Sequence, residues 1–308
     1  MNSNTVALKK SVFKNWPFYV FLIVPVISAF VFSYMPLYGI TIAFKDFKMA
    51  RGISGSEWVG FYYFEKIFSD PNFYRVLGNT IKISVLTLLT SFPVTIIFTL
   101  LINELGNLRF KKTIQTISYL PHFLSWVVVG AFVFQILSPT NGIVNAILTS
   151  LGLIESPIYF MVEEDKFIPI YLITMLWKET GFSILIYLSA IASIDSVLFE
   201  AATIDGANRF QRVLYIILPS IAPMIATMLI LKMGSLITVG FDPIFNLYTP
   251  STQRVADVIS TYVYRKGLIE TKYSLTTAIG LFQNVVSLIL VLLSNWLAKR
   301  ADPNYRLI

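Results

Sequence analysis

Residues 200–219 read EAATIDGANRFQRVLYIILP, and this polar segment lies between two apolar stretches that are each long enough to cross a bilayer. Its charged residues are Glu200, Asp205, Arg209 and Arg212. Charged side chains are costly inside hydrocarbon, so the segment is expected to lie in a loop at the membrane surface. Its residues nevertheless favour helix, which distinguishes it from an ordinary connecting loop.

The periodicity of this segment predicts two short helices joined at a glycine. Apolar residues recur mostly at steps of three and four, which is the spacing of one helix face: Leu198, Ala201, Ala202, Ala207, Phe210, Val213 and Leu214. Gly206 can adopt a backbone conformation that other residues avoid, and Pro219 fits the first turn of a following helix. We expect a helix-turn-helix whose apolar face is open to a partner protein. A helix that lies on lipid headgroups is the alternative.

The composition of the chain is that of a membrane protein. Of its 308 residues 56% are hydrophobic and 13% are charged, with a mean hydropathy of +0.70, whereas a soluble domain has about 25% charged residues. The net charge of +7 is dispersed over loops without a basic stripe, which argues against nucleic-acid binding. With no cysteine and one histidine, the chain lacks disulfides and thiol chemistry, and no metal site is expected.

Six apolar windows are long enough to span a hydrocarbon core of roughly 30 Å as helices. They cover residues 17–41, 83–103, 114–137, 167–191, 219–240 and 274–298. The first window is too long for a signal peptide and has no small-residue cleavage site, so it is expected to remain as the first helix. The predicted fold is an all-α membrane protein with six transmembrane helices, and the polar helical segment lies between the fourth and fifth.

The distribution of lysine and arginine predicts the orientation. With the N-terminus inside, the shorter cytoplasmic pieces carry eleven basic residues, while the much longer outer loops carry ten together with most of the acids. We therefore expect a multi-pass protein of the cytoplasmic membrane. Its parts are a cytoplasmic tail at 1–16, a membrane domain at 17–298 and a second cytoplasmic tail at 299–308.

Residues 200–219 match the pattern E-A-A-x3-G-x9-I-x-L-P at every position, through Glu200, Ala201, Ala202, Gly206, Ile216, Leu218 and Pro219. In this the chain resembles the permease subunits of binding-protein-dependent ABC importers, and in particular the maltose-type sugar branch. Three further stretches resemble the subgroup associated with uptake of polysaccharides and complex oligosaccharides. They are KKTIQTISYLPHFLSWVVVG (111–130), GFDPIFNLYTP (240–250) and ADVISTYVYRKGL (256–268).

The resemblance implies the type-1 transmembrane domain of these importers and assigns the polar segment a role as the coupling helix that docks on an ATPase subunit. The implied docking residues are Glu200, Ala201, Ala202, Asp205 and Gly206. The chain has no G-x-x-x-x-G-K-[ST] phosphate loop, so it is expected to be no enzyme, and ATP–Mg is expected to be bound by two partner ATPase subunits. The other implied partners are an external solute-binding lipoprotein and a second EAA-containing permease, giving a heterodimer, with a homodimer left open.

Two stretches are candidates for the path of an oligosaccharide substrate. The first stretch is GFDPIFNLYTP (240–250). By analogy with maltose-type permeases, it contributes Phe241, Asp242 and Asn246, because aromatic faces and planar polar groups suit sugar rings. An aromatic belt at the outer membrane interface is an equal alternative. The second stretch is WKETG, with Trp177 and Glu179 as candidates.

The charged residues of WKETG, Lys178 and Glu179, have two possible interpretations. They could be substrate-path residues or a structural ion pair. Neighbouring helical residues point about 100° apart, so Lys178 and Glu179 are expected not to face one spot, and one of them is expected to pair across helices. Lys232 poses the same choice. His122 is expected to make a satisfied polar contact rather than to relay protons.

Two other classes of function fit the sequence less well. An ion- or proton-coupled secondary transporter needs buried carboxylates and usually inverted repeats, but Glu179 is the single clear acid inside a span and no repeat is visible. A membrane enzyme would need a paired carboxylate, an activated nucleophile or a metal cluster, and the residues present do not assemble one.

Overall fold

The computed structural model describes residues 15–302, and its regular structure is almost entirely helical. The predicted tails, 1–16 and 299–308, lie mostly outside these residues. Four helical stretches are long and apolar enough to cross a membrane, and two bent helix pairs raise the number to six within the described part of the chain. The prediction of an all-helical membrane protein is confirmed.

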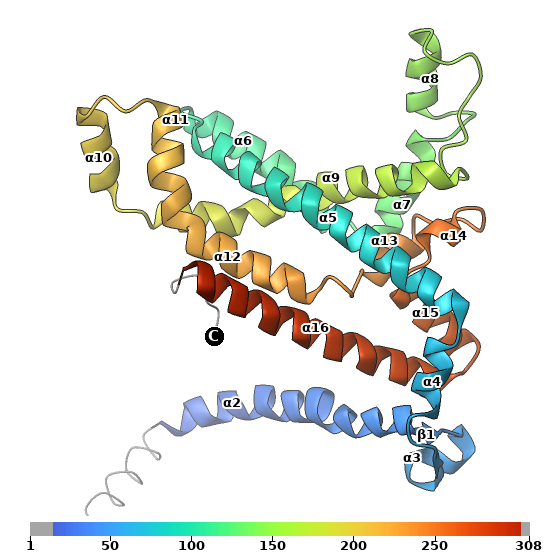
Figure 1. Ribbon diagram of the computed structural model, residues 1–308. Coiled ribbons are helices and arrows are strands. Elements are labelled where there is room, and N and C mark those ends of the chain that lie inside the picture. Colours follow the sequence, from blue (N-terminus) through green and yellow to red (C-terminus); the bar gives the residue numbers. More distant parts are fainter. Residues whose placement is uncertain (1–14, 303–308) are drawn as a thin grey trace, which may run out of the picture.

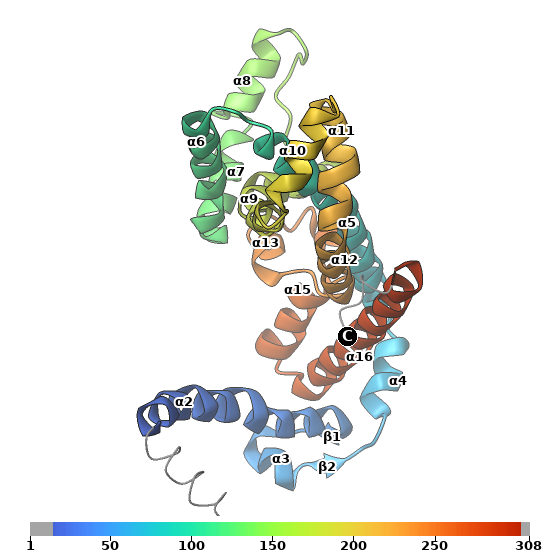
Figure 2. The same ribbon diagram turned by 90° about the vertical axis from the view of Figure 1, so that its left-hand side faces the viewer.

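The first span begins as α2 (Trp16–Ala29) and continues through the π-helix η1 (Phe30–Tyr34) and the 3-10 helix η2 (Met35–Phe44). No residue of α2 is buried. A helix that is apolar on all sides and exposed is suited to contact with lipid or another membrane helix. Figures 1 and 2 both place α2 along one edge of the molecule, at the opposite edge from α8 (Ile143–Ser150).

The second and sixth spans are the long helices α5 (Pro71–Asn103) and α16 (Tyr273–Ala301). α5 starts before the predicted window of 83–103, because Arg75 and Lys82 are charged but remain within the helix. A charge-free window measures the apolar part of a helix and not its full length. Asp70 caps the start of α5 by accepting a hydrogen bond from the backbone nitrogen of Asn72 at 2.9 Å.

The third span is broken, so the prediction of one helix over 114–137 is wrong. The chain forms α6 (Leu108–Tyr119), the 3-10 turn η4 (Leu120–Phe123) and α7 (Trp126–Ile136), with a bend of 102° between the two halves. Pro121 lacks the N–H that would continue α6. Ser125 then starts α7, because its hydroxyl accepts a hydrogen bond from the backbone nitrogen of Val128 at 3.4 Å.

The fourth span is α9 (Glu164–Ala192), and the fifth runs from α11 (Arg209–Arg212) through the π-helix η5 (Val213–Ile217) into α12 (Leu218–Gly234). The predicted end of the fifth helix at 240 is wrong, since α12 stops at Gly234. Residues 235–240 are irregular and lead into α13 (Phe241–Phe245). α10 (Ser196–Ile204) lies between the fourth and fifth spans, as predicted for the polar segment.

The two ends of the helix bundle differ (Figure 1). One end, called the coupling end here, carries α10, α11 and the C-terminal end of α16. The opposite, loop-rich end carries the short connecting elements: β1 (Lys45–Asp46) with its antiparallel partner β2 (Glu57–Trp58), η3 (Met49–Arg51), α3 (Gly52–Gly55), α4 (Tyr62–Phe68), α14 (Gln253–Ala256), α15 (Ile259–Tyr264) and η6 (Arg265–Ile269).

The apolar core consists of three clusters along the bundle. The first, around Phe73 and Ile279, joins η2, α4, α5, α15 and α16. The second, around Tyr171 and Ile244, joins α5, α9 and α13. The third, around Ile191 and Ile217, lies beneath α10 and α11 at the coupling end. Each span is thus attached near an end of the bundle, and the coupling end has a small core of its own.

Candidate functional site

α10 leaves the direction of the membrane spans. The angle between α9 and α10 is 73°, so α10 runs across the end of the bundle (Figure 1). The change of direction is made at Asp195, whose carboxylate accepts a hydrogen bond from the backbone nitrogen of Val197 at 3.0 Å and caps α10. The cap explains why a new helix starts here instead of a continuation of α9.

The turn after α10 explains the glycine of the motif. Gly206 has a φ of +73°, in the left-handed region that favours glycine. The backbone nitrogen of Ala207 donates to the carbonyl of Ala202 at 2.8 Å, and that of Gly206 donates to Thr203 at 3.2 Å. This pair of hydrogen bonds is the Schellman motif, which closes a helix and reverses the chain.

The second arm of the turn starts with a reciprocal cap. The side chain of Asn208 accepts a hydrogen bond from the backbone nitrogen of Gln211 at 2.9 Å, and the Gln211 side chain accepts one from the nitrogen of Asn208 at 2.8 Å. Such a capping box satisfies two N–H groups that the start of a helix leaves free. α11 therefore begins at a defined residue and continues directly into the fifth span.

A small apolar core attaches both arms to the bundle. Phe199 of α10 and Val213 of η5 pack on the buried side chains of Ile191 and Ile217, and Leu100 of α5 joins them. The guanidinium of Arg209 also donates to the backbone carbonyl of Glu104 at 3.4 Å. Phe199 is thus the side chain through which α10 joins a cluster whose other members come from α5, α9, η5 and α12.

The rest of α10 and its turn faces outward. The five predicted docking residues lie in the second half of α10 and the turn that follows; Ala202 is half-buried and the other four are exposed: Glu200, Ala201, Asp205 and Gly206. Ile204 is 86% exposed and Phe210 is 73% exposed. Large apolar side chains beside exposed small and acidic ones form a surface suited to a protein partner.

The first substrate-path group lies on α13. The rings of Phe241 and Phe245 stack with centroids 4.7 Å apart, and the ring of Tyr264 lies 4.9 Å from that of Phe241. Asp242 is exposed at the start of α13. Asn246 is half-buried, and its amide donates to the backbone carbonyl of Asp242 at 2.8 Å. The group presents an aromatic cluster beside the exposed carboxylate of Asp242, which has no side-chain partner within residues 15–302.

The second group lies on α9 and corrects the expectation for its charged pair. The ammonium of Lys178 lies 3.4 Å from a carboxylate oxygen of Glu179, so the two side chains do meet. Both are long enough to reach His122 of η4: Lys178 donates to its backbone carbonyl at 2.7 Å, and Glu179 contacts its ring nitrogen Nδ1 at 2.8 Å. The ring of His122 stacks on Phe182 with centroids 4.1 Å apart.

α7 lies beside both substrate-path groups. Trp177 of α9 stacks with Phe132 of α7, with centroids 6.0 Å apart. A Cβ atom on Gly130 of α7 would lie 2.5 Å from the backbone oxygen of Asn246, so α7 and α13 approach closely there. Trp177 and Asn246 are thus brought to one helix from distant parts of the sequence. Within residues 15–302, Phe241 and Glu179 share no hydrogen bond or ring contact with each other.

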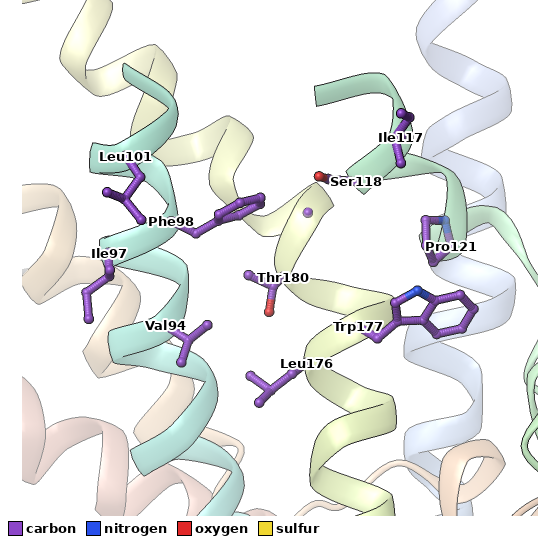
Figure 3. Close-up of a pocket in the computed structure, with 11 residues that line it drawn as sticks. Val94, Ile97, Phe98, Leu101, Ile117, Ser118, Pro121, Leu176, Trp177 and Thr180 are labelled. Carbon is purple, nitrogen blue, oxygen red and sulfur yellow. The ribbon is translucent and has the colours of Figure 1, made fainter. Parts of the chain in front are cut away.

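Sequence reasoning missed a cavity of about 460 Å³ between α5, α6 and α9 (Figure 3). Its lining is mainly apolar: Phe98 lines it from α5, Ile117 from α6, and Trp177 and Thr180 from α9. α6 and α9 touch at its edge, because a Cβ on Gly181 would lie 1.9 Å from the backbone oxygen of Ser118. Gly181 follows WKET directly in the sequence, and it was the signal that could have indicated the close approach of α6 and α9.

The all-helical bundle, its six candidate spans and the exposed helix between the fourth and fifth define a transmembrane permease. The chain belongs to the family of the binding-protein-dependent transport system inner membrane component, which matches residues 72–307. It therefore serves as the membrane component of an ABC importer.

Two relatives from Bacillus subtilis (strain 168) are similar over most of their length. The polygalacturonan/rhamnogalacturonan transport system permease protein YteP is 42% identical over 270 residues, which cover 88% of this chain and 84% of the relative. Protein LplB is 39% identical over 284 residues, which cover 92% of this chain and 89% of the relative.

Two solved structures have the same fold. One is a bacterial ABC transporter that imports the acidic polysaccharide alginate; it matches with a TM-score of 0.86 and 40% identity over 96% of this chain and 99% of the other. The second is a bacterial alginate ABC transporter in complex with an alginate pentasaccharide-bound periplasmic protein. It matches with a TM-score of 0.85 and 40% identity, over 95% of this chain and 97% of the other.

Proposed function

We propose that this permease imports oligosaccharides or polysaccharide fragments, and that α10 is the lever through which partner ATPase subunits drive it. The support for the cargo is the similarity to permeases for polygalacturonan and alginate over nearly the whole chain. The support for the lever is the form of α10, which is largely exposed and joins the cluster at the end of the bundle through Phe199.

The mechanical role follows from what α10 touches. A partner that grips the exposed residues around Glu200 and Ala201 can move Phe199, and this side chain packs on the ends of α9 and η5. Packed side chains transmit displacement as a rigid unit instead of absorbing it. Closure of two ATP–Mg-bound ATPase subunits would therefore rotate the spans between inward-facing and outward-facing states.

The proposed assembly contains a second permease with its own EAA segment, giving a heterodimer, together with two ATPase subunits and an external solute-binding lipoprotein. The bound periplasmic protein of the alginate transporter supports the last of these partners. In this arrangement the coupling end faces the cytoplasm, and both tails of the chain lie on that side. The loop-rich end receives the sugar from the binding protein.

The path of the sugar passes α13 and α7. Phe241 supplies an aromatic face, and Asp242 and Asn246 supply polar groups of the kind that hold sugar hydroxyls. Trp177 adds a second exposed aromatic face beside Phe132. Glu179 has a structural part in addition, because its carboxylate is engaged by His122 and Lys178 at the break of the third span.

The test is ATP-driven glycan uptake by the complete importer in proteoliposomes, with Glu200→Ala compared with Glu155→Ala. Both residues are exposed acids, but Glu155 lies in the loop after α8, away from α10. We expect Glu200→Ala to weaken ATPase association and reduce uptake, while Glu155→Ala changes neither. Full assembly and full uptake by Glu200→Ala would contradict the proposal. Uptake driven by a proton or ion gradient without ATP would replace it with secondary transport.

A further inference from the structure

A second cavity, of about 170 Å³, lies between α5, α9, α12 and the segment 235–240, and seven of its twelve lining residues have a hydroxyl or ammonium group. Its hydroxyl-bearing residues are Ser84, Thr87, Ser91, Tyr171, Ser235 and Thr238. Lys232 lines it too, and Gly240 places it next to Phe241 at the start of α13. Polar side chains between membrane spans usually face a cavity or a partner, and the hydroxyls and the lysine here can bind a hydrophilic cargo.

The cavity lies within the membrane region. Tyr171 and Met175 line it from α9, which begins at Glu164 near the loop-rich end. At a rise of about 1.5 Å per residue they lie roughly 10 to 17 Å along that helix. Lys232 contacts the same cavity from the last turn of α12, where free backbone carbonyls stabilise a positive charge.

Lys232 differs from the other lysine in the middle of a span. The ammonium of Lys178 is 4% exposed and is held by the carbonyl of His122 and by Glu179. Lys232 is exposed and forms no ion pair or hydrogen bond through its side chain within residues 15–302. A cation that lines a cavity between spans and forms no ion pair within residues 15–302 is available to bind an anion from outside the chain.

The hydroxyl groups of the cavity complement this charge. Thr87 donates its proton to the carbonyl of Ile83 at 2.7 Å, Ser235 donates to that of Lys232 at 2.9 Å, and Thr238 donates to that of Ser235 at 3.0 Å. Each proton is therefore occupied, and the remaining lone pairs can accept hydrogen bonds. The cavity offers one cation and several acceptors, which matches a ligand with one carboxylate and several hydroxyl donors.

We propose that this cavity is a subsite for a uronate residue of an acidic oligosaccharide, with Lys232 pairing with the sugar carboxylate. The inference rests on the proposed sugar import and adds the charge of the cargo and the residue that selects it. A neutral sugar would fill the same space but leave the ammonium unpaired, so the site discriminates by charge. Gly240 connects the subsite to the aromatic face of Phe241 further along the path.

The test measures uptake of oligogalacturonate and of its fully methyl-esterified form by the complete importer in proteoliposomes. We expect Lys232→Gln to raise the oligogalacturonate concentration for half-maximal uptake by roughly tenfold or more. This is the factor that corresponds to the loss of one charge-assisted hydrogen bond, here between the ammonium and the sugar carboxylate. The corresponding concentration for the ester should change much less, because the ester has no carboxylate to pair with the ammonium. Lys82→Gln is the matched control, because Lys82 is an exposed lysine within α5 that does not line the cavity. Lys232→Arg should retain most of the preference for the acid.

An equal effect of Lys232→Gln on the acid and the ester, or no effect on either, would overturn the subsite. If Lys232→Gln does not assemble, the assembled Lys232→Arg variant decides: a preference for the ester would overturn the subsite, and a preference for the acid would support it. Wild-type importer that takes up only the ester with ATP would also overturn the subsite, while ATP-driven sugar import would stand. Loss of ATP dependence in the wild type would contradict the proposed function instead.

Discussion

At the scale of single residues, the EAA pattern corresponds to a specific set of backbone and side-chain roles. Gly206 reverses the chain at φ +73°. Ala201 and Ala202 of α10, close before this turn, have only methyl side chains. Ala202 also supplies the carbonyl that closes the turn. The spacing of the motif is therefore the spacing of one Schellman motif, and the exposed Glu200 lies two residues before Ala202, where that motif begins.

Gly206→Ala is expected to weaken the turn by about 1 kcal/mol, the cost of placing a Cβ atom in the left-handed region. No atom lies within 4 Å of the position that this Cβ would occupy, so the effect comes from backbone strain alone. Reduced thermal stability of the purified importer, with reduced ATP-driven uptake, is the expected result.

Gly280→Ala is the control, because Gly280 lies within α16, has an ordinary helical φ and also has open space around it. It should be neutral or slightly stabilising, since alanine favours helix over glycine. Equal loss of stability in both variants would show that the conformation of Gly206 is unimportant.

At the scale of elements, the sequence predicted the apolar windows and the helical segment between the fourth and fifth, but not where helices bend. The six apolar windows each correspond to a helix or a bent pair. The break at η4 was hidden because the apolar run continues through Pro121, and hydropathy does not measure direction. Pro25, Pro93 and Pro223 lie inside continuous helices, so a proline alone does not predict a break.

The candidate site was predicted to a similar extent. The expected docking residues are contiguous in the chain, so their common position on α10 and its turn could be predicted. The meeting of Lys178 and Glu179 at His122 could not, because it depends on where η4 packs against α9. The polar cavity around Lys232 combines three helices that are far apart in sequence, so no local pattern indicates it.

Gly181→Ala is expected to disrupt the crossing of α6 and α9. The added Cβ would lie 1.9 Å from the backbone oxygen of Ser118, which cannot rotate away. Overpacking of this kind costs roughly 1 to 3 kcal/mol or more, so the assembled importer should unfold at a lower temperature.

Gly78→Ala in α5 serves as the comparison, because nothing lies within 4 Å of its added Cβ. A melting temperature of Gly181→Ala equal to that of Gly78→Ala would mean that the two helices are not in backbone contact in the assembly.

At the scale of the whole molecule, the two ends of the bundle carry different elements. The loop-rich end carries the short elements and the aromatic cluster of α13, and the coupling end carries α10 on its own small core. α5, α9 and α12 connect the two ends and also line the polar cavity. Displacement of α10 would therefore act on the same three helices that surround the proposed sugar subsite.

The most direct measurement is site-specific cross-linking of α10 to the ATPase subunit in the complete importer. The chain contains no cysteine, so Ala201→Cys introduces a single thiol on the exposed face of α10. We expect a thiol-reactive cross-linker to join this residue to the ATPase, and Glu57→Cys at the loop-rich end to give no such product. ATPase adducts from Glu57→Cys and none from Ala201→Cys would contradict the proposed coupling role of α10.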